Sequence, residues 1–122
     1  MKHFSNSNEL RSKFEHGIKT VSDTVASTLG PKGRTVVLHQ KDKMPFATKD
    51  GVTVAKFIDL EDPIENTGAQ IVKQAAEKTN QEAGDGTTTT TVLTYAMYRE
   101  AQKYLASGAP PIELKKGMES AV

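Results

Sequence analysis

The feature that most constrains this chain is a short stretch rich in glycine and threonine, set between two segments with helical spacing of apolar residues. It runs Ala83-Gly84-Asp85-Gly86 and continues with five threonines, Thr87 to Thr91. Glycine permits a tight turn that lets backbone amides approach a ligand. If a helix begins near Thr87, its first N–H groups have no partner inside the helix, and the helix dipole adds to their attraction for an anion.

The same stretch carries groups suited to a phosphate held with a metal ion. Mg²⁺ is commonly bound by one or two carboxylates together with substrate phosphates, and Asp85 would supply one of them. Thr88 and Thr89 add hydroxyls at the same place. The alternative is an ordinary helix–turn–helix corner, because Asp-Gly is a turn signal and threonine caps helices well. A P-loop is excluded, since the sequence contains no Gly-x-x-x-x-Gly-Lys-[Ser/Thr].

Composition narrows the classes of fold and function. The chain has 122 residues, of which 36% are hydrophobic and 25% charged, so we expect one globular domain with a modest core. A net charge of +1 gives no electrostatic footprint for nucleic acid. The absence of cysteine excludes disulfides and thiolate chemistry. We find no membrane-length apolar run and no signal-peptide core, and therefore expect a cytoplasmic protein without membrane partners.

Periodicity predicts long helices and one small β-hairpin. Helices are expected over residues 9–29, from Asp62-Pro63 to Gly84, from about Thr87 to Gly108, and from Ile112 onward. Met97 and the tyrosines, at helical spacing, are expected in the core. Strands are expected over residues 35–39 and 44–48, and residues 52–58 also alternate like a strand. Residues 112–122 resemble the opening of an amphipathic helix, so we expect the first piece of a longer protein.

Two further loops are candidate parts of a phosphate site. Gly30-Pro31-Lys32-Gly33-Arg34 would lay amides and cations along a polyphosphate, and the alternative is a solvated turn. Thr48-Lys49-Asp50-Gly51 puts a second carboxylate and a cation on a tight loop. Phosphoryl transfer needs such groups to position a water molecule and to balance charge, although this loop too is an ordinary turn in the alternative reading.

Taken together, three stretches resemble the nucleotide-binding signatures of the group I chaperonins, the GroEL family. They are Thr28-Leu29-Gly30-Pro31-Lys32-Gly33-Arg34, Thr48-Lys49-Asp50-Gly51 and Gly84-Asp85-Gly86-Thr87-Thr88-Thr89. Supporting matches are Leu60-Glu61-Asp62, Glu65-Asn66, Gly68-Ala69-Gln70, Val92-Leu93 and Glu113-Leu114-Lys115-Lys116-Gly117. The resemblance runs from about Phe14 to the end, and its specificity lies in the order and spacing of the three motifs.

The resemblance implies a truncated equatorial-domain-like bundle, mainly α, with residues 1–122 as the N-terminal segment of an ATP-binding domain. Residues 51–57 would then form a short helix rather than a strand. Thr28, Leu29, Gly30 and Pro31 would line the nucleotide, with Gly30 against its phosphates. Lys49 would contact it with a K⁺ ion nearby, and Gly51 of the same loop would also bind the nucleotide. Asp85 would hold Mg²⁺; Gly86, Thr87, Thr88 and Thr89 would cradle the β- and γ-phosphates; and Asp50 would orient the attacking water.

The sequence departs from the family at several places. Thr90 stands where alanine is usual, which adds a hydroxyl in a packed region, and residues 40–45 of the hairpin turn diverge. The family's second catalytic carboxylate, its adenine contacts and its hinge and apical domains belong to parts of a much longer chain. We therefore expect negligible ATP hydrolysis by these residues alone, with a homo-oligomeric ring, unfolded client proteins and a co-chaperonin as partners of the whole.

Three hypotheses remain open at this stage. The first is an ATP-driven folding machine of which this chain is a piece, in the bacterial cytosol or encoded by a virus, with a processed organelle form as the less favoured location. The second is a short, non-hydrolysing assembly or regulatory module. The third is an unrelated kinase-like or phosphate-binding domain, which the absence of a P-loop disfavours.

Overall fold

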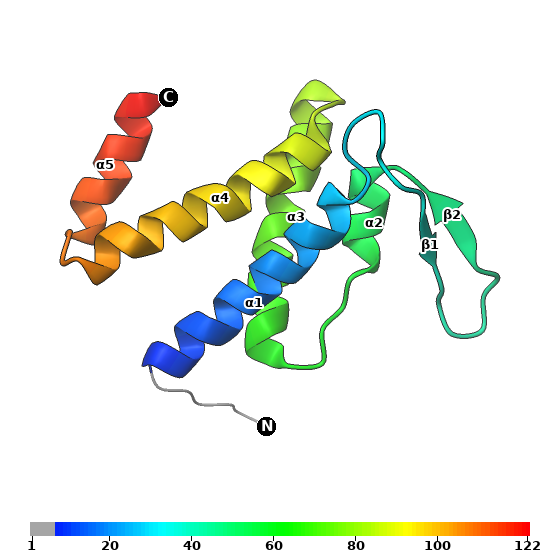
Figure 1. Ribbon diagram of the computed structural model, residues 1–122, viewed down its shortest axis with the longest axis horizontal. Coiled ribbons are helices and arrows are strands. Elements are labelled where there is room, and N and C mark those ends of the chain that lie inside the picture. Colours follow the sequence, from blue (N-terminus) through cyan, green and yellow to red (C-terminus); the bar gives the residue numbers. More distant parts are fainter. Residues whose placement is uncertain (1–6) are drawn as a thin grey trace.

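The computed structural model describes residues 7–122, which form five helices and one two-stranded sheet (Figure 1). The order of elements is α1 (Ser7–Ala26), β1 (Val36–Leu38), β2 (Phe46–Thr48), α2 (Gly51–Phe57), α3 (Pro63–Ala83), α4 (Thr87–Ala106) and α5 (Pro111–Ala121). The strands pair antiparallel, with Val37 opposite Ala47. The predicted class, a mainly helical bundle with a small hairpin, is therefore confirmed.

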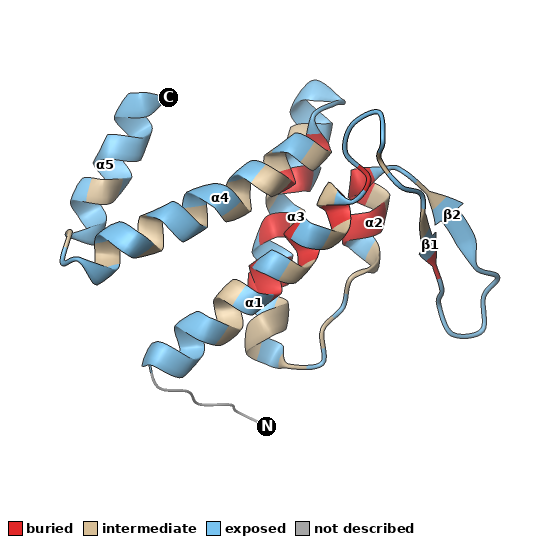
Figure 2. Ribbon diagram, in the orientation of Figure 1, coloured by how far each residue is buried: buried red, intermediate tan, exposed pale blue. Residues whose placement is uncertain are grey.

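The core lies where α1 crosses α3, with α2 and α4 packed beside them (Figure 2). Small residues let the helix backbones touch: a Cβ added to Gly68 of α3 would lie 2.4 Å from the carbonyl oxygen of Phe14 in α1. A Cβ on Gly17 of α1 would lie 1.8 Å from the carbonyl oxygen of Glu65. The buried cluster around these contacts is Ile18, Val21, Val25, Val54, Ala55, Ala69 and Val72.

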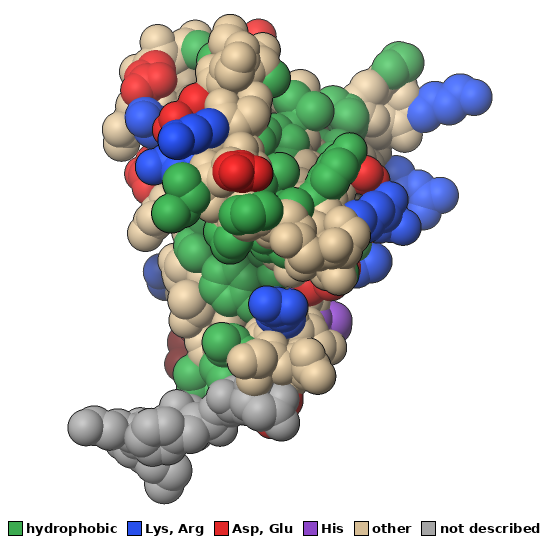
Figure 3. All heavy atoms as spheres, turned by 90° about the vertical axis from the view of Figure 1, so that its left-hand side faces the viewer, with side chains coloured by type: hydrophobic (Ala, Val, Ile, Leu, Met, Phe, Trp, Pro, Cys, Tyr) green, Lys and Arg blue, Asp and Glu red, His purple; other side chains and the backbone are tan. Residues whose placement is uncertain are grey.

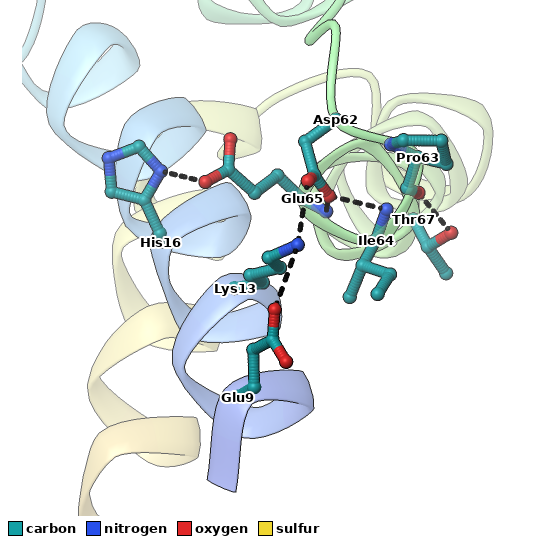
Figure 4. A network of polar contacts seen from close by, with 8 residues as sticks. All are labelled: Glu9, Lys13, His16, Asp62, Pro63, Ile64, Glu65 and Thr67. Carbon is teal, nitrogen blue, oxygen red and sulfur yellow. Dashed lines mark hydrogen bonds and ion pairs between the residues drawn. The ribbon is translucent and has the colours of Figure 1, made fainter. Parts of the chain in front are cut away.

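A polar network joins α1 to the start of α3 (Figure 4). Asp62 caps α3 by accepting bonds from the amides of Ile64 (2.9 Å) and Glu65 (3.1 Å), and Lys13 lies 3.0 Å from the same carboxylate. The Glu65 amide and then Lys13 hold the pKa of Asp62 below its ordinary value. His16 Nδ1 lies 3.1 Å from Glu65 Oε1. The helix start predicted at Asp62-Pro63 is confirmed, and the Asp62 cap also binds Lys13 of α1.

Two expectations from periodicity are wrong. Residues 51–57 form helix α2 rather than a strand, as the family resemblance implied, because Asp50 caps the segment and Val52, Val54 and Ala55 are all buried by the neighbouring helices. The first helix ends at Ala26 rather than Leu29. Beyond Ala26 the backbone turns more tightly than an α-helix, because the Thr28 amide donates to the carbonyl of Val25, three residues earlier, at 3.0 Å.

The outer half of α4 is also more exposed than its spacing predicted. Met97 and Tyr104 are 48% and 58% exposed, because α4 runs beyond α1 and α3 and, among residues 7–122, packs against α5 at its far end (Figure 1). Figure 3 views this side of the molecule and shows hydrophobic side chains gathered across the middle of it. Within residues 7–122, no helix is both long and apolar enough to cross a membrane.

Candidate functional site

Residues from three separate loops line one hollow of about 290 Å³. Leu29 follows α1, the 49–51 segment joins β2 to α2, and the 85–89 segment leads from the α3–α4 turn into α4. These loops meet in the upper part of Figure 1. Every lining residue is one that the sequence singled out: Leu29, Lys49, Asp50, Gly51, Asp85, Gly86, Thr87, Thr88 and Thr89.

The N-terminus of α4 opens into this hollow. Its cap residue is Gly86, whose φ of 80° lies in the left-handed region and which offers no side-chain hydrogen bond to the first turn. The first intrahelical bond runs from the Thr90 amide to the Gly86 carbonyl at 2.9 Å. The amides of Thr87, Thr88 and Thr89 thus stand at the positive end of the helix dipole, an arrangement that binds anions. The helix start predicted near Thr87 is confirmed.

A second helix terminus reaches the same hollow. A Cβ added to Gly51, the first residue of α2, would lie 2.3 Å from Thr88 Oγ1 and 3.1 Å from Val25 Cγ1. The absence of a side chain at Gly51 therefore lets the start of α2 lie against Thr88 at the start of α4, and any larger residue would have to displace the Thr88 and Val25 side chains. In the sequence Gly51 belongs to a loop motif, but nothing in the local pattern indicates this interhelical contact.

Two carboxylates and one ammonium group complete the lining. Asp50 Oδ2 accepts bonds from the Thr53 amide (3.2 Å) and hydroxyl (2.5 Å), so the side chain is fixed as the cap of α2. Asp85 Oδ1 accepts a bond from the Gly86 amide at 2.7 Å, and Oδ2 has no partner within residues 7–122. Lys49 is exposed, and the described part of the chain gives it no ion-pair partner.

The hollow fits a metal ion only together with an oxyanion. Residues 7–122 contain no group of three or more His, Asp or Glu side chains placed to hold a metal. Asp85 supplies one carboxylate with an uncommitted oxygen. Mg²⁺ bound by one or two carboxylates and substrate phosphates needs no more than this from the protein, and the adjacent helix terminus suits those phosphates.

Three of the predicted residues lie outside the lining. The Thr28 hydroxyl is buried and donates to the Val25 carbonyl at 2.7 Å, while Gly30 and Pro31 are exposed. Gly30 has a φ of 80° and its carbonyl accepts a bond from the Gly33 amide at 2.9 Å, so the loop folds on itself. Of this motif, Leu29 alone is among the residues that line the hollow.

The sequence of residues 21–122 matches the profile of a family described as the TCP-1/cpn60 chaperonin family. The chain belongs to this chaperonin family. It is also similar in structure to the chaperonin gp146 from the bacteriophage EL 2 (Pseudomonas aeruginosa), crystallised in the presence of ATP-BeFx. One crystal form matches 92% of this chain with 32% identity and a TM-score of 0.78. Another matches 76% of it with 36% identity and a TM-score of 0.70.

This chaperonin chain spans only part of the length of that relative. The matched region is 19% of the phage protein in one crystal form and 17% in the other. Membership of the chaperonin family supports a chaperone role for proteins of this family. The part of that role that this segment performs must be inferred from the site itself.

Proposed function

We propose that this chain is the N-terminal part of the ATP-binding equatorial domain of a ring-forming chaperonin. The observation that carries the proposal is the convergence of three sequence-distant loops on one hollow that receives the N-termini of α2 and α4. The phage relative was crystallised with ATP-BeFx, which supports a nucleotide as the ligand. Client proteins and a co-chaperonin would bind through regions outside these residues.

Each lining group has a role that its chemistry suits. The amides of Thr87, Thr88 and Thr89 would bind phosphate oxygens, and Lys49 would balance their charge beside a K⁺ ion. Asp85 would hold Mg²⁺, which when bound neutralises charge on the β- and γ-phosphates. Asp50 already has one carboxylate oxygen committed to capping α2, so its other oxygen would orient the attacking water.

Calorimetric titration of the chain with ATP, with and without Mg²⁺, tests this proposal. Asp85→Asn should weaken Mg·ATP binding by about tenfold or more, the size expected for a lost charge-assisted contact. It should leave metal-free ATP binding unchanged or slightly stronger, because the negative charge is gone. Asp59→Asn is the matched control, since Asp59 is exposed and lines a different hollow. Equal Mg·ATP affinity in the Asp85 variant and the wild type would refute the metal role.

A short non-hydrolysing module is the second candidate function. The observation that favours it is the small acid set of the hollow, whose lining includes Asp50 and Asp85 as its carboxylates. With Asp85 on the metal, Asp50 is the one carboxylate of the lining left to orient water, and one of its oxygens already caps α2, so among residues 7–122 the hollow has no second carboxylate for hydrolysis. We expect the 122-residue chain to bind Mg·ATP without turnover. Steady release of phosphate that disappears in Asp50→Asn would overturn this expectation.

A further inference from the structure

One side-chain hydrogen bond joins α3 to α4 close to the proposed phosphate site. Thr79 Oγ1 and Thr90 Oγ1 lie 3.0 Å apart, and both side chains are half-buried. Thr79 Oγ1 also lies 3.1 Å from the carbonyl oxygen of Ala75, to which it donates its single proton. Thr90 is therefore the donor in the cross-helix bond, and the three groups form a short chain of hydrogen bonds.

Both threonines also lie close to the turn between the helices. Thr79 Cγ2 lies 4.0 Å from the position that a Cβ on Gly86 would occupy, and the Thr90 amide donates to the Gly86 carbonyl at 2.9 Å. Gly84 and Gly86 have φ values of 68° and 80°. Asp85 therefore lies between two glycines, whose backbones have more conformational freedom than those of other residues. The bond between Thr79 and Thr90 thus joins, close to Gly86, the two helices that the turn connects.

We propose that Thr79 and Thr90 are positioning residues that fix the turn of residues 84–86 and thereby raise the affinity of the phosphate site. The inference rests on the proposed function. Asp85 and the first amides of α4 must keep their place relative to Gly51 and Lys49, which belong to another element. Other α4 hydroxyls bond within their own helix, Thr91 to the Thr87 carbonyl and Thr94 to the Thr90 carbonyl. The Thr90 hydroxyl instead ties the beginning of α4 to the end of α3.

Three variants of the 122-residue chain test the positioning role. Thr90→Val keeps the side-chain shape and removes the hydroxyl, Thr90→Ser keeps the hydroxyl, and Thr94→Val removes a hydroxyl that bonds only within α4. Mg·ATP is titrated into each, and backbone amide resonances of residues 84–89 are followed by NMR. We expect about fivefold weaker binding in Thr90→Val, the size of one neutral hydrogen bond. Thr90→Ser and Thr94→Val should bind within about twofold of wild type.

Amide hydrogen exchange in the nucleotide-free chain gives a second readout. Thr90→Val should exchange the Gly86 amide several times faster than wild type, whereas Thr94→Val should not. Wild-type affinity and wild-type exchange in Thr90→Val would overturn the positioning role and leave the proposed function standing. Equal weakening by Thr94→Val would also overturn it, since any lost hydroxyl on α4 would then suffice. If the wild-type chain does not bind Mg·ATP, both the proposed function and the effect on affinity are wrong. The exchange rates would then test whether Thr79 and Thr90 fix the turn of residues 84–86.

Discussion

Replacing Gly68 by alanine tests the packing that holds this fold together. A Cβ at Gly68 would lie 2.4 Å from the carbonyl oxygen of Phe14, whereas ordinary contacts of a Cβ begin near 3.4 Å. The obstacle is backbone, so it cannot rotate away as a side-chain end would. Helices α1 and α3 would have to separate by about 1 Å at the centre of the core.

The expected cost follows from two opposing terms. Overpacking of a well-packed core costs about 1–3 kcal/mol. Alanine recovers up to about 1 kcal/mol of helix propensity relative to glycine. We therefore expect Gly68→Ala to lose up to about 2 kcal/mol of unfolding free energy, which in a domain of this size lowers the melting temperature by up to roughly 12 °C.

Gly117→Ala is the matched control. It makes the same change inside helix α5, where nothing lies within 4 Å of the new Cβ. At that position only the higher helix propensity of alanine applies, so the midpoints of thermal and urea unfolding should stay the same or rise. Thermal and urea unfolding followed by circular dichroism measure both variants. If Gly68→Ala is as stable as Gly117→Ala, the helices do not approach as closely as the structure places them.

The remaining predictions concern the two aspartate caps. The folded chain lowers the pKa of Asp62 from its ordinary value of 3.8, so this group contributes stability that is complete above that value and is lost as the pH falls through the lowered pKa. In urea unfolding, the deficit of Asp62→Asn relative to wild type should therefore be largest near neutral pH and shrink as the pH falls below 3.8, and a deficit independent of pH would contradict the bonds from the Glu65 amide and Lys13 that lower the pKa of Asp62. Asp50→Ala should lose about 1 kcal/mol by uncapping α2, a loss that Asp50→Asn largely avoids because asparagine also caps helices. Equal losses in the two Asp50 variants would show that charge rather than capping is what the position supplies.

Much of the fold followed from short-range signals. Asp62-Pro63 marks the start of α3 because a capping carboxylate precedes a proline at the first helical position. Gly84 marks its end because the cap adopts a left-handed conformation, with a φ of 68°. Such signals act within a few residues, so they can be read without knowing the tertiary structure.

Other features depend on contacts that no local pattern specifies. The seven residues of α2 are too few to separate helical from alternating spacing, and burial against α1 and α3 decides their conformation. The spacing of apolar residues on α4 predicts an apolar face, but it does not indicate which element covers that face. The prediction that Met97 and Tyr104 lie in the core is therefore wrong. The sequence shows that Thr90 adds a hydroxyl group. It does not show that this hydroxyl bonds to Thr79, because Thr79 lies on another helix.

The candidate site was predictable as a set of motifs rather than as a geometry. Each glycine-rich loop taken alone was compatible with an ordinary turn. Family resemblance joined the loops, and the structure brings residues of all three to one hollow, with Thr28, Gly30 and Pro31 outside its lining. The contact of Gly51 with Thr88, which brings two helix termini together, became visible only in three dimensions.

We propose that three loops of this chain form one site for the phosphates of Mg·ATP. Mapping which backbone amides shift when Mg·ATP is added to the isotope-labelled chain tests it most directly. We expect shifts at Leu29, at residues 49–51 and at residues 85–89 together, saturating with a single dissociation constant, and little change along α5. Shifts confined to one loop, or centred on α5 or the hairpin turn, would contradict it.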